Sequence, residues 1–162
     1  MMQVRYLFPF ILIVFLFSGC GQQPYMKEKS AFIVLKTPSL KYADQGFVYE
    51  NKDEVKVEIY GNGQALFSLR ITPSAVCTGT LRCMDRKTFN DAMLSPYYPE
   101  GTLEAIFRGK PVFDEKGIIK KRNGFTQKLI NGYKYNIMYS VLNNETIFRD
   151  TINHIFIKIK RL

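Results

Sequence analysis

The sequence has few of the residues and motifs on which enzymes commonly rely. Its 162 residues include a single histidine, His154, and three cysteines. There is no Gly-x-Ser-x-Gly motif, no phosphate-binding glycine loop and no His-Glu-x-x-His motif. The adjacent acidic residues, Asp53-Glu54 and Asp114-Glu115, fall in predicted turns and do not suggest a paired-carboxylate site. One histidine with two further cysteines makes a poor zinc ligand set. We therefore expect no enzyme, no cofactor and no metal site, and a structural role for His154 within a predicted strand.

The sequence also lacks an apolar run of the roughly 20 residues that a membrane-spanning helix needs. The apolar run from Tyr6 to Phe17 follows Arg5 and precedes Ser18-Gly19, which is typical of a secretory signal peptide. The segment Leu16–Cys20 resembles the lipobox of bacterial lipoproteins, in which the cysteine is acylated and becomes the mature N-terminus. Phe17 is bulkier than the usual residue there, and an ordinary secretory signal with an incidental cysteine is the alternative. The sequence thus predicts a signal peptide at residues 1–19, a lipid anchor at Cys20 with a tether through residue 29, and one domain at residues 30–162.

Acidic residues are outnumbered by basic residues, 14 to 23, which gives a formal net charge of +9. Such an excess indicates an anionic partner, and export argues against nucleic acid, so lipid headgroups, lipopolysaccharide phosphates or an acidic protein remain. A basic surface that serves solubility is the alternative. One cluster is predicted to form a basic lip on a hairpin that could touch anionic headgroups, although a merely solvated hairpin would look the same. Its members are Lys116, Lys120, Lys121 and Arg122.

Cys77 and Cys83 are left as a pair once Cys20 is assigned to the lipid anchor. In an oxidising compartment they are expected to form a disulfide that closes a small loop between two short strands. Such a short loop would stabilise the fold by about 2 kcal/mol. The two thiols do not form a Cys-x-x-Cys motif before a helix, so redox catalysis is not expected.

Alternation of apolar and polar residues dominates most of the chain and is typical of strands with one buried face. It is clearest at residues 55–60, 66–71, 133–141 and 154–160, and residues 31–36 and 47–50 are also predicted strands. Turn sequences such as Gly61-Asn62-Gly63 and Asn131-Gly132 separate these runs. Two short amphipathic helices are predicted between the blocks of strands, one at 87–94 after an N-cap at Asp85 and one at 102–108 before Gly109. The pattern predicts an α+β fold, with a curved antiparallel sheet of about eight strands forming a half-open β-barrel under a short helical lid.

Large apolar side chains are abundant, with 13 phenylalanines and 10 tyrosines. They could fill the inside of the sheet as an ordinary packed core, or line an apolar cavity that holds acyl chains. The residues predicted to face this interior, and to form the acyl-chain cavity if one exists, are Val57, Ile59, Phe67, Leu69, Leu103, Ile106, Phe107, Ile137 and Tyr139.

The order of these elements resembles the LolA/LolB family of lipoprotein carriers and outer-membrane lipoprotein receptors. It resembles uncharacterised lipoproteins of the Helicobacter and Campylobacter type more closely. The resemblance rests on the lipobox cysteine, the tether, the two blocks of strands and the segment Leu103–Pro111, which looks like the family's second lid helix and the exit after it. Strands at 134–141 and 154–160 stand in the place of the closing strands. The resemblance implies an unclosed β-barrel, a helical lid and an apolar cavity for acyl chains.

Two features depart from this family. The turn Gly61–Gln64 lacks the exposed leucine with which the family's receptors meet the membrane, and the Cys77/Cys83 pair is not part of the family pattern. Gly21, rather than aspartate, follows Cys20, which by analogy favours the outer membrane.

Taken together, these features predict a non-enzymatic, lipid-anchored outer-membrane lipoprotein that faces the periplasm. By resemblance, it would bind acyl chains of lipoproteins, or a related lipid, and receive them from a periplasmic carrier protein. The alternative is a structural or interaction lipoprotein that docks on an envelope protein complex.

Overall fold

A computed structural model describes residues 27–162, in which one antiparallel sheet predominates. The first block of strands comprises β1 (Lys27–Lys36), β2 (Lys41–Glu50), β3 (Val55–Gly61), β4 (Gln64–Ile71), β5 (Ala75–Thr78) and β6 (Arg82–Asp85). The helical segment comprises α2 (Arg86–Met93), α3 (Thr102–Arg108) and the short 3-10 helix η2 (Phe113–Glu115). The second block comprises β7 (Ile118–Lys121), β8 (Gly124–Asn131), β9 (Tyr135–Leu142), β10 (Glu145–Asp150) and β11 (Ile155–Arg161). The predicted signal peptide and Cys20 lie outside the described residues.

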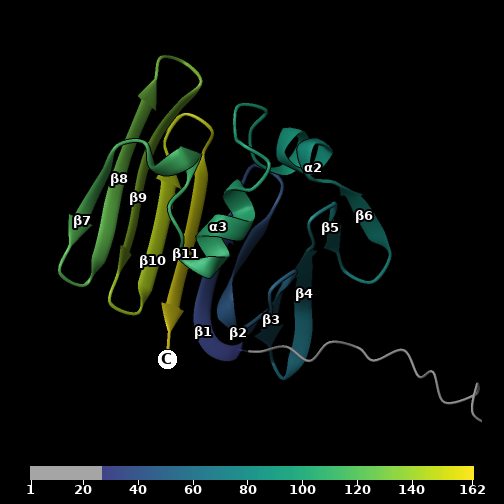
Figure 1. Cartoon of the computed structure of the whole chain (residues 1–162). Coiled ribbons are helices and arrows are strands. Elements are labelled where there is room, and N and C mark those ends of the chain that lie inside the picture. Colours follow the sequence, from purple (N-terminus) through teal and green to yellow (C-terminus); the bar gives the residue numbers. More distant parts are fainter. Residues whose placement is uncertain (1–26) are drawn as a thin grey trace, which may run out of the picture.

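The eleven strands of the described chain follow the order β6-β5-β4-β3-β2-β1-β11-β10-β9-β8-β7. The first and last strands pair with each other, with Ala31 opposite Arg161 and Ile33 opposite Ile159, so they join the two blocks in the middle of the sheet. The edges are β6 and β7, which flank the helical segment in the sequence and do not pair with each other in the described chain. The sheet is therefore open. Its two halves bend toward each other, and α3 lies between them (Figure 1).

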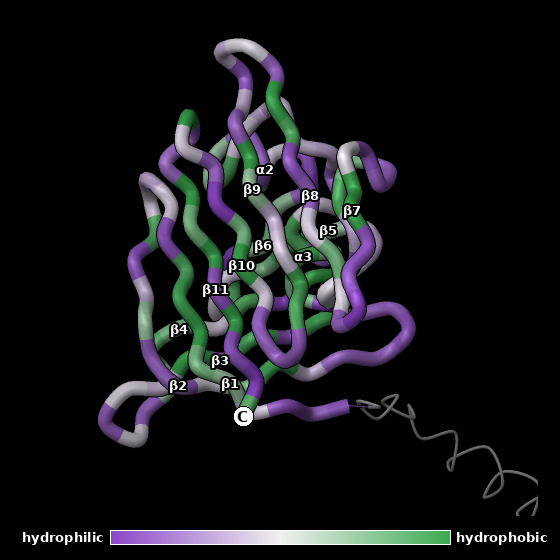
Figure 2. Tube along the Cα trace, turned by 90° about the vertical axis from the view of Figure 1, so that its left-hand side faces the viewer, coloured by the Kyte–Doolittle hydropathy of each residue, from purple (hydrophilic) through white to green (hydrophobic). Residues whose placement is uncertain are grey.

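The alternating strands turn their apolar residues toward the inside of the bend. In β3, Val57 and Ile59 are fully buried and lie opposite Leu69 and Phe67 of β4. The residues between them are polar and face the outer side, and Figure 2 shows the same alternation along several strands. Burial of one face of each strand fixes the register, because a shift by one residue would expose the whole apolar set.

The start of α2 and the end of α3 lie on residues that favour helix termini. Asp85 is the N-cap of α2, and its carboxylate accepts a hydrogen bond from the Thr88 backbone N–H at 2.8 Å. Gly109 ends α3 in the left-handed conformation at φ +66°, where its N–H contacts the carbonyls of Ala105 and Ile106. Glycine suits this position because it has no Cβ to clash there. Both predicted helices are confirmed, the first of them one residue earlier than expected.

Glycine is also required at Gly46, where β2 pairs closely with β3 opposite Ile59. A Cβ on Gly46 would lie 2.0 Å from the backbone oxygen of Glu58. At the β3–β4 turn, Asn62 and Gly63 have φ values of +52° and +77°, as the predicted tight hairpin turn requires.

The predicted mostly antiparallel sheet is confirmed, but the expected number of strands was too low. The strands β7, β8 and β10 were missed. β7 and β10 are short, and β8 lacks a clear alternating run because its buried residue between Phe125 and Leu129 is the polar Gln127; all three are stabilised by pairing with neighbouring strands. His154 was expected within a strand, yet it lies in the turn before β11 at φ +54°. Likewise, Tyr133 lies in the β8–β9 turn, and β9 begins only at Tyr135.

Candidate functional site

The residues predicted to face the interior are all buried in one apolar core. Their exposed fractions are at most 8%, and they belong to a single contiguous cluster. They come from β3, β4, α3 and β9, so both blocks of the sheet contribute. Their burial is confirmed, whereas contact with acyl chains stays a prediction.

Helix α3 covers this apolar face. It packs on β3 of the first block and on β10 of the second. The side chains of Leu103, Ile106 and Phe107 are between 0% and 2% exposed, because their spacing places them on one side of the helix. α3 therefore bridges the two halves of the bent sheet.

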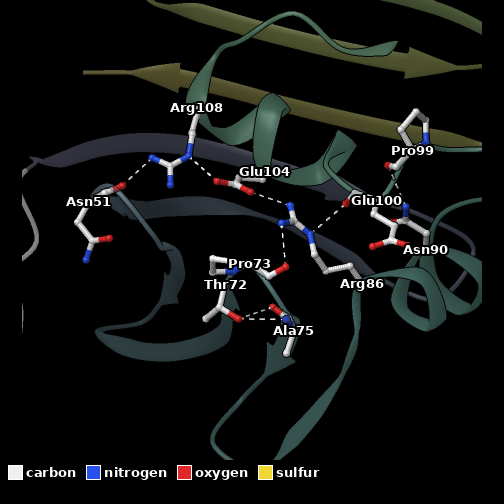
Figure 3. Close-up of polar contacts among 10 residues, drawn as sticks. All are labelled: Asn51, Thr72, Pro73, Ala75, Arg86, Asn90, Pro99, Glu100, Glu104 and Arg108. Atoms are coloured by element: carbon white, nitrogen blue, oxygen red, sulfur yellow. Dashed lines mark hydrogen bonds and ion pairs between the residues drawn. The ribbon is translucent and has the colours of Figure 1, made fainter. Parts of the chain in front are cut away.

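Two arginines and one glutamate tie α3 to the first block (Figure 3). Glu104 accepts hydrogen bonds from Arg86 Nη2 at 2.7 Å and from Arg108 Nε at 2.8 Å. Arg108 Nη1 also donates to the carbonyl of Asn51 at 2.8 Å, and Arg86 Nη1 donates to that of Pro73 at 3.4 Å. Burial raises the pKa of the Glu104 carboxyl, but the hydrogen bonds from Arg86 and Arg108 outweigh this effect and hold the pKa below its usual range. We call Arg86, Glu104 and Arg108 the α3 clamp.

The second block holds α3 through side-chain hydrogen bonds to backbone carbonyls. Arg161 of β11 donates from Nη2 to the carbonyl of Phe107 at 2.9 Å and from Nη1 to Thr146 Oγ1 at 3.2 Å. The hydroxyl of Tyr139 donates to the carbonyl of Lys110 at 2.9 Å, just after the helix. The end of α3 is thus fastened to both halves of the sheet.

The polar groups around α3 are incompletely paired. Among the described residues, the buried side-chain polar atoms without a hydrogen-bond partner are Thr102 Oγ1, Arg108 Nη2 and Arg161 Nε. Two of them belong to α3, and the third belongs to the arginine that contacts its last turn. A buried unpaired polar group costs about 1–3 kcal/mol. In the docked position of α3, its apolar side chains are buried, but some of the polar atoms at its edges lack hydrogen-bond partners.

The segment between α2 and α3 is anchored by Asp150 at the end of β10. Tyr98 donates its hydroxyl to Asp150 Oδ2 at 2.5 Å, and Asn153 Nδ2 donates to the same oxygen at 2.6 Å. The other oxygen accepts the Asn136 N–H at 3.0 Å and the Ile152 N–H at 2.9 Å. Burial raises the pKa of Asp150, but these hydrogen bonds outweigh it and lower the pKa. Burial, with the bond to Asp150, raises the pKa of Tyr98.

Four hollows at the surface of the described chain are lined by residues other than the predicted interior ones. One of about 460 Å³ lies where α3 meets the start of β1 and the end of β2. A second, of about 410 Å³, lies on the other side of α3 beside Pro111–Glu115. Both border the helix.

Cys77 and Cys83 face each other across β5 and β6, and their sulfurs are bonded. The hairpin that they close carries Leu81, which is 91% exposed. Composition alone could not single out this leucine, since exposure depends on the turn in which it lies.

The four residues of the predicted basic lip are exposed, but they do not form one group on the hairpin. Lys120 and Lys121 end β7, and Arg122 lies in the β7–β8 turn. Lys116 lies before β7, where its carbonyl accepts a hydrogen bond from Gln127 Nε2 at 2.8 Å. β7 is an edge strand, and lysines on an edge strand oppose association with the sheet of another molecule. This effect is a second physical explanation for Lys120 and Lys121.

Residues 27–162 contain no group of three or more histidine, cysteine, aspartate or glutamate side chains placed to hold a metal ion. The same residues contain no helix long and apolar enough to cross a membrane.

Sequence reasoning missed the α3 clamp, Arg161 and Asp150. The spacing of Glu104 and Arg108, four residues apart on a predicted helix, is the one local signal that pointed to part of it. The other contacts join residues that are distant in sequence: Arg86 with Glu104, Arg108 with Asn51, and Arg161 with Phe107. The sequence matches none of the protein-family models and none of the curated proteins with which it was compared.

Proposed function

We propose that this chain is a LolB-like outer-membrane lipoprotein that binds acyl chains of lipoproteins, or of a related lipid, inside a half-open β-barrel with α3 as its lid. No bond is made or broken. The proposed cycle is displacement of α3, entry of acyl chains against the apolar side of the sheet, and release to the membrane. Cys20 would keep the binding domain at the membrane surface.

The observation that carries the proposal is the character of the α3 contact. The helix covers an apolar face made by both halves of an open sheet, and its apolar side chains are buried there. Its polar border includes buried atoms without partners among the described residues. Such an element can leave the sheet without breaking any strand pairing.

The energies of lid opening and acyl-chain burial are of similar size. Exposing the side chains of Leu103, Ile106 and Phe107 costs about 1.5–3 kcal/mol each, or about 5–9 kcal/mol together. An acyl chain of about 16 carbons gains about 0.8 kcal/mol per buried CH₂, or about 12 kcal/mol when fully buried. One bound acyl chain can therefore offset the displacement of α3.

Photocrosslinking tests the binding site. The full chain is incubated with a fatty acid that carries a diazirine near its methyl end, irradiated, and mapped by mass spectrometry. We expect labels on the inward-facing residues of α3 and β9, such as Phe107 and Tyr139. Labels confined to outward-facing residues such as Phe32 and Met138, which are 39% and 52% exposed, would contradict the proposal.

Depletion in the source cells tests the cellular role. If the chain receives lipoproteins at the outer membrane, its loss should leave other lipoproteins in the periplasm or inner membrane. Normal distribution of lipoproteins after depletion would argue against a receptor.

A second candidate is a structural lipoprotein that docks on an envelope protein complex. Two observations favour it: the interior residues pack against one another, and Leu81 is presented on a disulfide-closed hairpin. A photoreactive amino acid at position 81 tests it in cells. One stoichiometric protein adduct would favour docking, and no protein adduct would exclude docking through this hairpin.

A further inference from the structure

The hollow of about 460 Å³ at the end of α3 is a basic site at the rim of the apolar interior. It is lined by Lys27 and Lys29 of β1, Glu50 of β2, Asn51 and Lys52 of the following turn, and Glu104, Arg108 and Lys110 of α3 and its exit. Because Lys29 and Glu50 continue the inward-facing alternation of β1 and β2, the hollow lies where the buried apolar face gives way to solvent.

The positive charge of this hollow exceeds what its acids neutralise. Five of its lining side chains are basic and two are acidic. Glu50 is paired with Lys29 at 3.4 Å, and Glu104 is already engaged by Arg86 and Arg108. Within the described chain, Lys27, Lys52 and Lys110 take part in no ion pair that would offset their charge.

Arg108 provides a buried donor at the same place. Its side chain is only 10% exposed, and its Nη2 has no hydrogen-bond partner among residues 27–162. In Figure 3 the other two guanidinium nitrogens of Arg108 contact Asn51 and Glu104, and no contact is drawn from this one. A guanidinium with a free donor and nearby ammonium groups is the combination that binds phosphate oxygens well.

We propose that this hollow, the basic mouth, binds the phosphate group of a lipid whose acyl chains enter the apolar interior beneath α3. The inference rests on the proposed function, and it specifies the ligand as a phosphate-bearing lipid rather than a neutral diacylglyceryl group. The two parts of such a lipid match the two adjoining surfaces: hydrocarbon meets the inward faces of the sheet and α3, and the phosphate meets Arg108, Lys52 and Lys110.

Calorimetry with three probes tests the basic mouth on the full chain. The probes are dihexanoyl phosphatidic acid, dihexanoylglycerol and inorganic phosphate, each below the concentration at which it aggregates. The test variant is Lys52→Gln/Lys110→Gln, which removes two exposed charges from the mouth without removing a described side-chain contact. The matched control is Lys36→Gln/Lys41→Gln, which removes two exposed charges at the β1–β2 turn, away from the mouth.

We expect the unmodified chain to bind the phosphatidic acid at least about tenfold more tightly than dihexanoylglycerol, as one or more charge-assisted hydrogen bonds imply. The Lys52→Gln/Lys110→Gln variant should lose most of this preference, and the control should keep it. Equal binding of both lipids, unchanged in the variant, would overturn the basic mouth and leave acyl-chain binding standing. Binding of inorganic phosphate alone, weakened in the variant, would support a phosphate site but refute the acyl-chain function. Binding of none of the three probes would overturn both.

Discussion

Replacing Glu104 by glutamine tests whether the α3 clamp holds the helix on the sheet. The carboxylate accepts hydrogen bonds from Arg86 at 2.7 Å and Arg108 at 2.8 Å, and the two arginine side chains are only 12% and 10% exposed. A hydrogen bond to a charged group contributes about 1.5–3 kcal/mol. Glutamine can still accept one of the two bonds, but Arg86 then loses its carboxylate partner and Arg108 keeps only Glu50, whose Oε2 lies 3.8 Å from Arg108 Nη1. Because Glu104 is itself about one-quarter exposed, we expect a loss of about 2–3 kcal/mol in the free energy of unfolding.

The measurement is urea unfolding of the full chain, followed by circular dichroism. The matched control is Asp91→Asn on α2, which breaks the ion pair between Lys87 and Asp91 at 2.7 Å. These side chains are 69% and 39% exposed, so the control should cost less than about 0.5 kcal/mol. If Glu104→Gln costs no more than Asp91→Asn, the clamp does not hold α3. A second readout is uptake of the diazirine fatty acid, which should be faster in Glu104→Gln if α3 is the lid.

The pH dependence of the same comparison has a definite sign. The folded pKa of Glu104 is lowered, so its contribution to stability is fully present above the unfolded value of about 4.3 and is lost as pH falls through the folded pKa. The stability gap between the unmodified chain and Glu104→Gln should therefore be largest near neutral pH and should shrink below about pH 4. A gap that stays constant down to about pH 2 would refute the ionic basis of the clamp.

Three further substitutions test other parts of the structure, each by urea unfolding. Tyr98→Phe removes the hydroxyl bonded to Asp150 and should cost about 2 kcal/mol, whereas Tyr133→Phe, at a 77% exposed side chain, should cost almost nothing; equal losses would contradict the anchoring role of Asp150. Cys77→Ser should lower the free energy of unfolding by about 2 kcal/mol, and chemical reduction of the unmodified chain should reproduce that loss; a reduced chain of unchanged stability would refute it. Gly46→Ala places a Cβ 2.0 Å from the Glu58 backbone oxygen and should lower the free energy of unfolding by more than about 3 kcal/mol. Gly63→Ala meets no neighbouring atom and should cost about 1 kcal/mol because of its positive φ. The reverse order would refute the close approach of β2 and β3 at Gly46.

Local patterns predicted the parts of the fold that depend on neighbours in sequence. The alternation in β3 and β4 identified Val57, Ile59, Phe67 and Leu69 as buried, because strand burial has a period of two residues. Asp85 and Gly109 marked helix termini because capping involves only the adjacent turn. Short strands such as β7 were missed because their stability comes from a partner strand and not from their own composition.

The polar part of the candidate site was less predictable for the same reason. Arg86 and Glu104 are 18 residues apart, and Arg161 meets the carbonyl of Phe107 across 54 residues. Nothing in the sequence near Arg161 distinguishes it from the neighbouring Lys160. In the predicted basic lip, by contrast, residues that are close in sequence are separated in the structure. Lys116 precedes β7, whereas Lys120, Lys121 and Arg122 lie at its other end.

The sequence by itself determined the sheet-rich class, the two helices and the buried set, because hydrophobic periodicity and capping are local properties of the chain. The tertiary structure alone decided that β1 and β11 join in the middle, which leaves β6 and β7 as unpaired edges of the described sheet. That arrangement carries α3 across the apolar face and brings Arg86, Arg108 and Arg161 to its borders. Pairing between the first and last strands depends on long-range register and loop closure, and no local pattern encodes it.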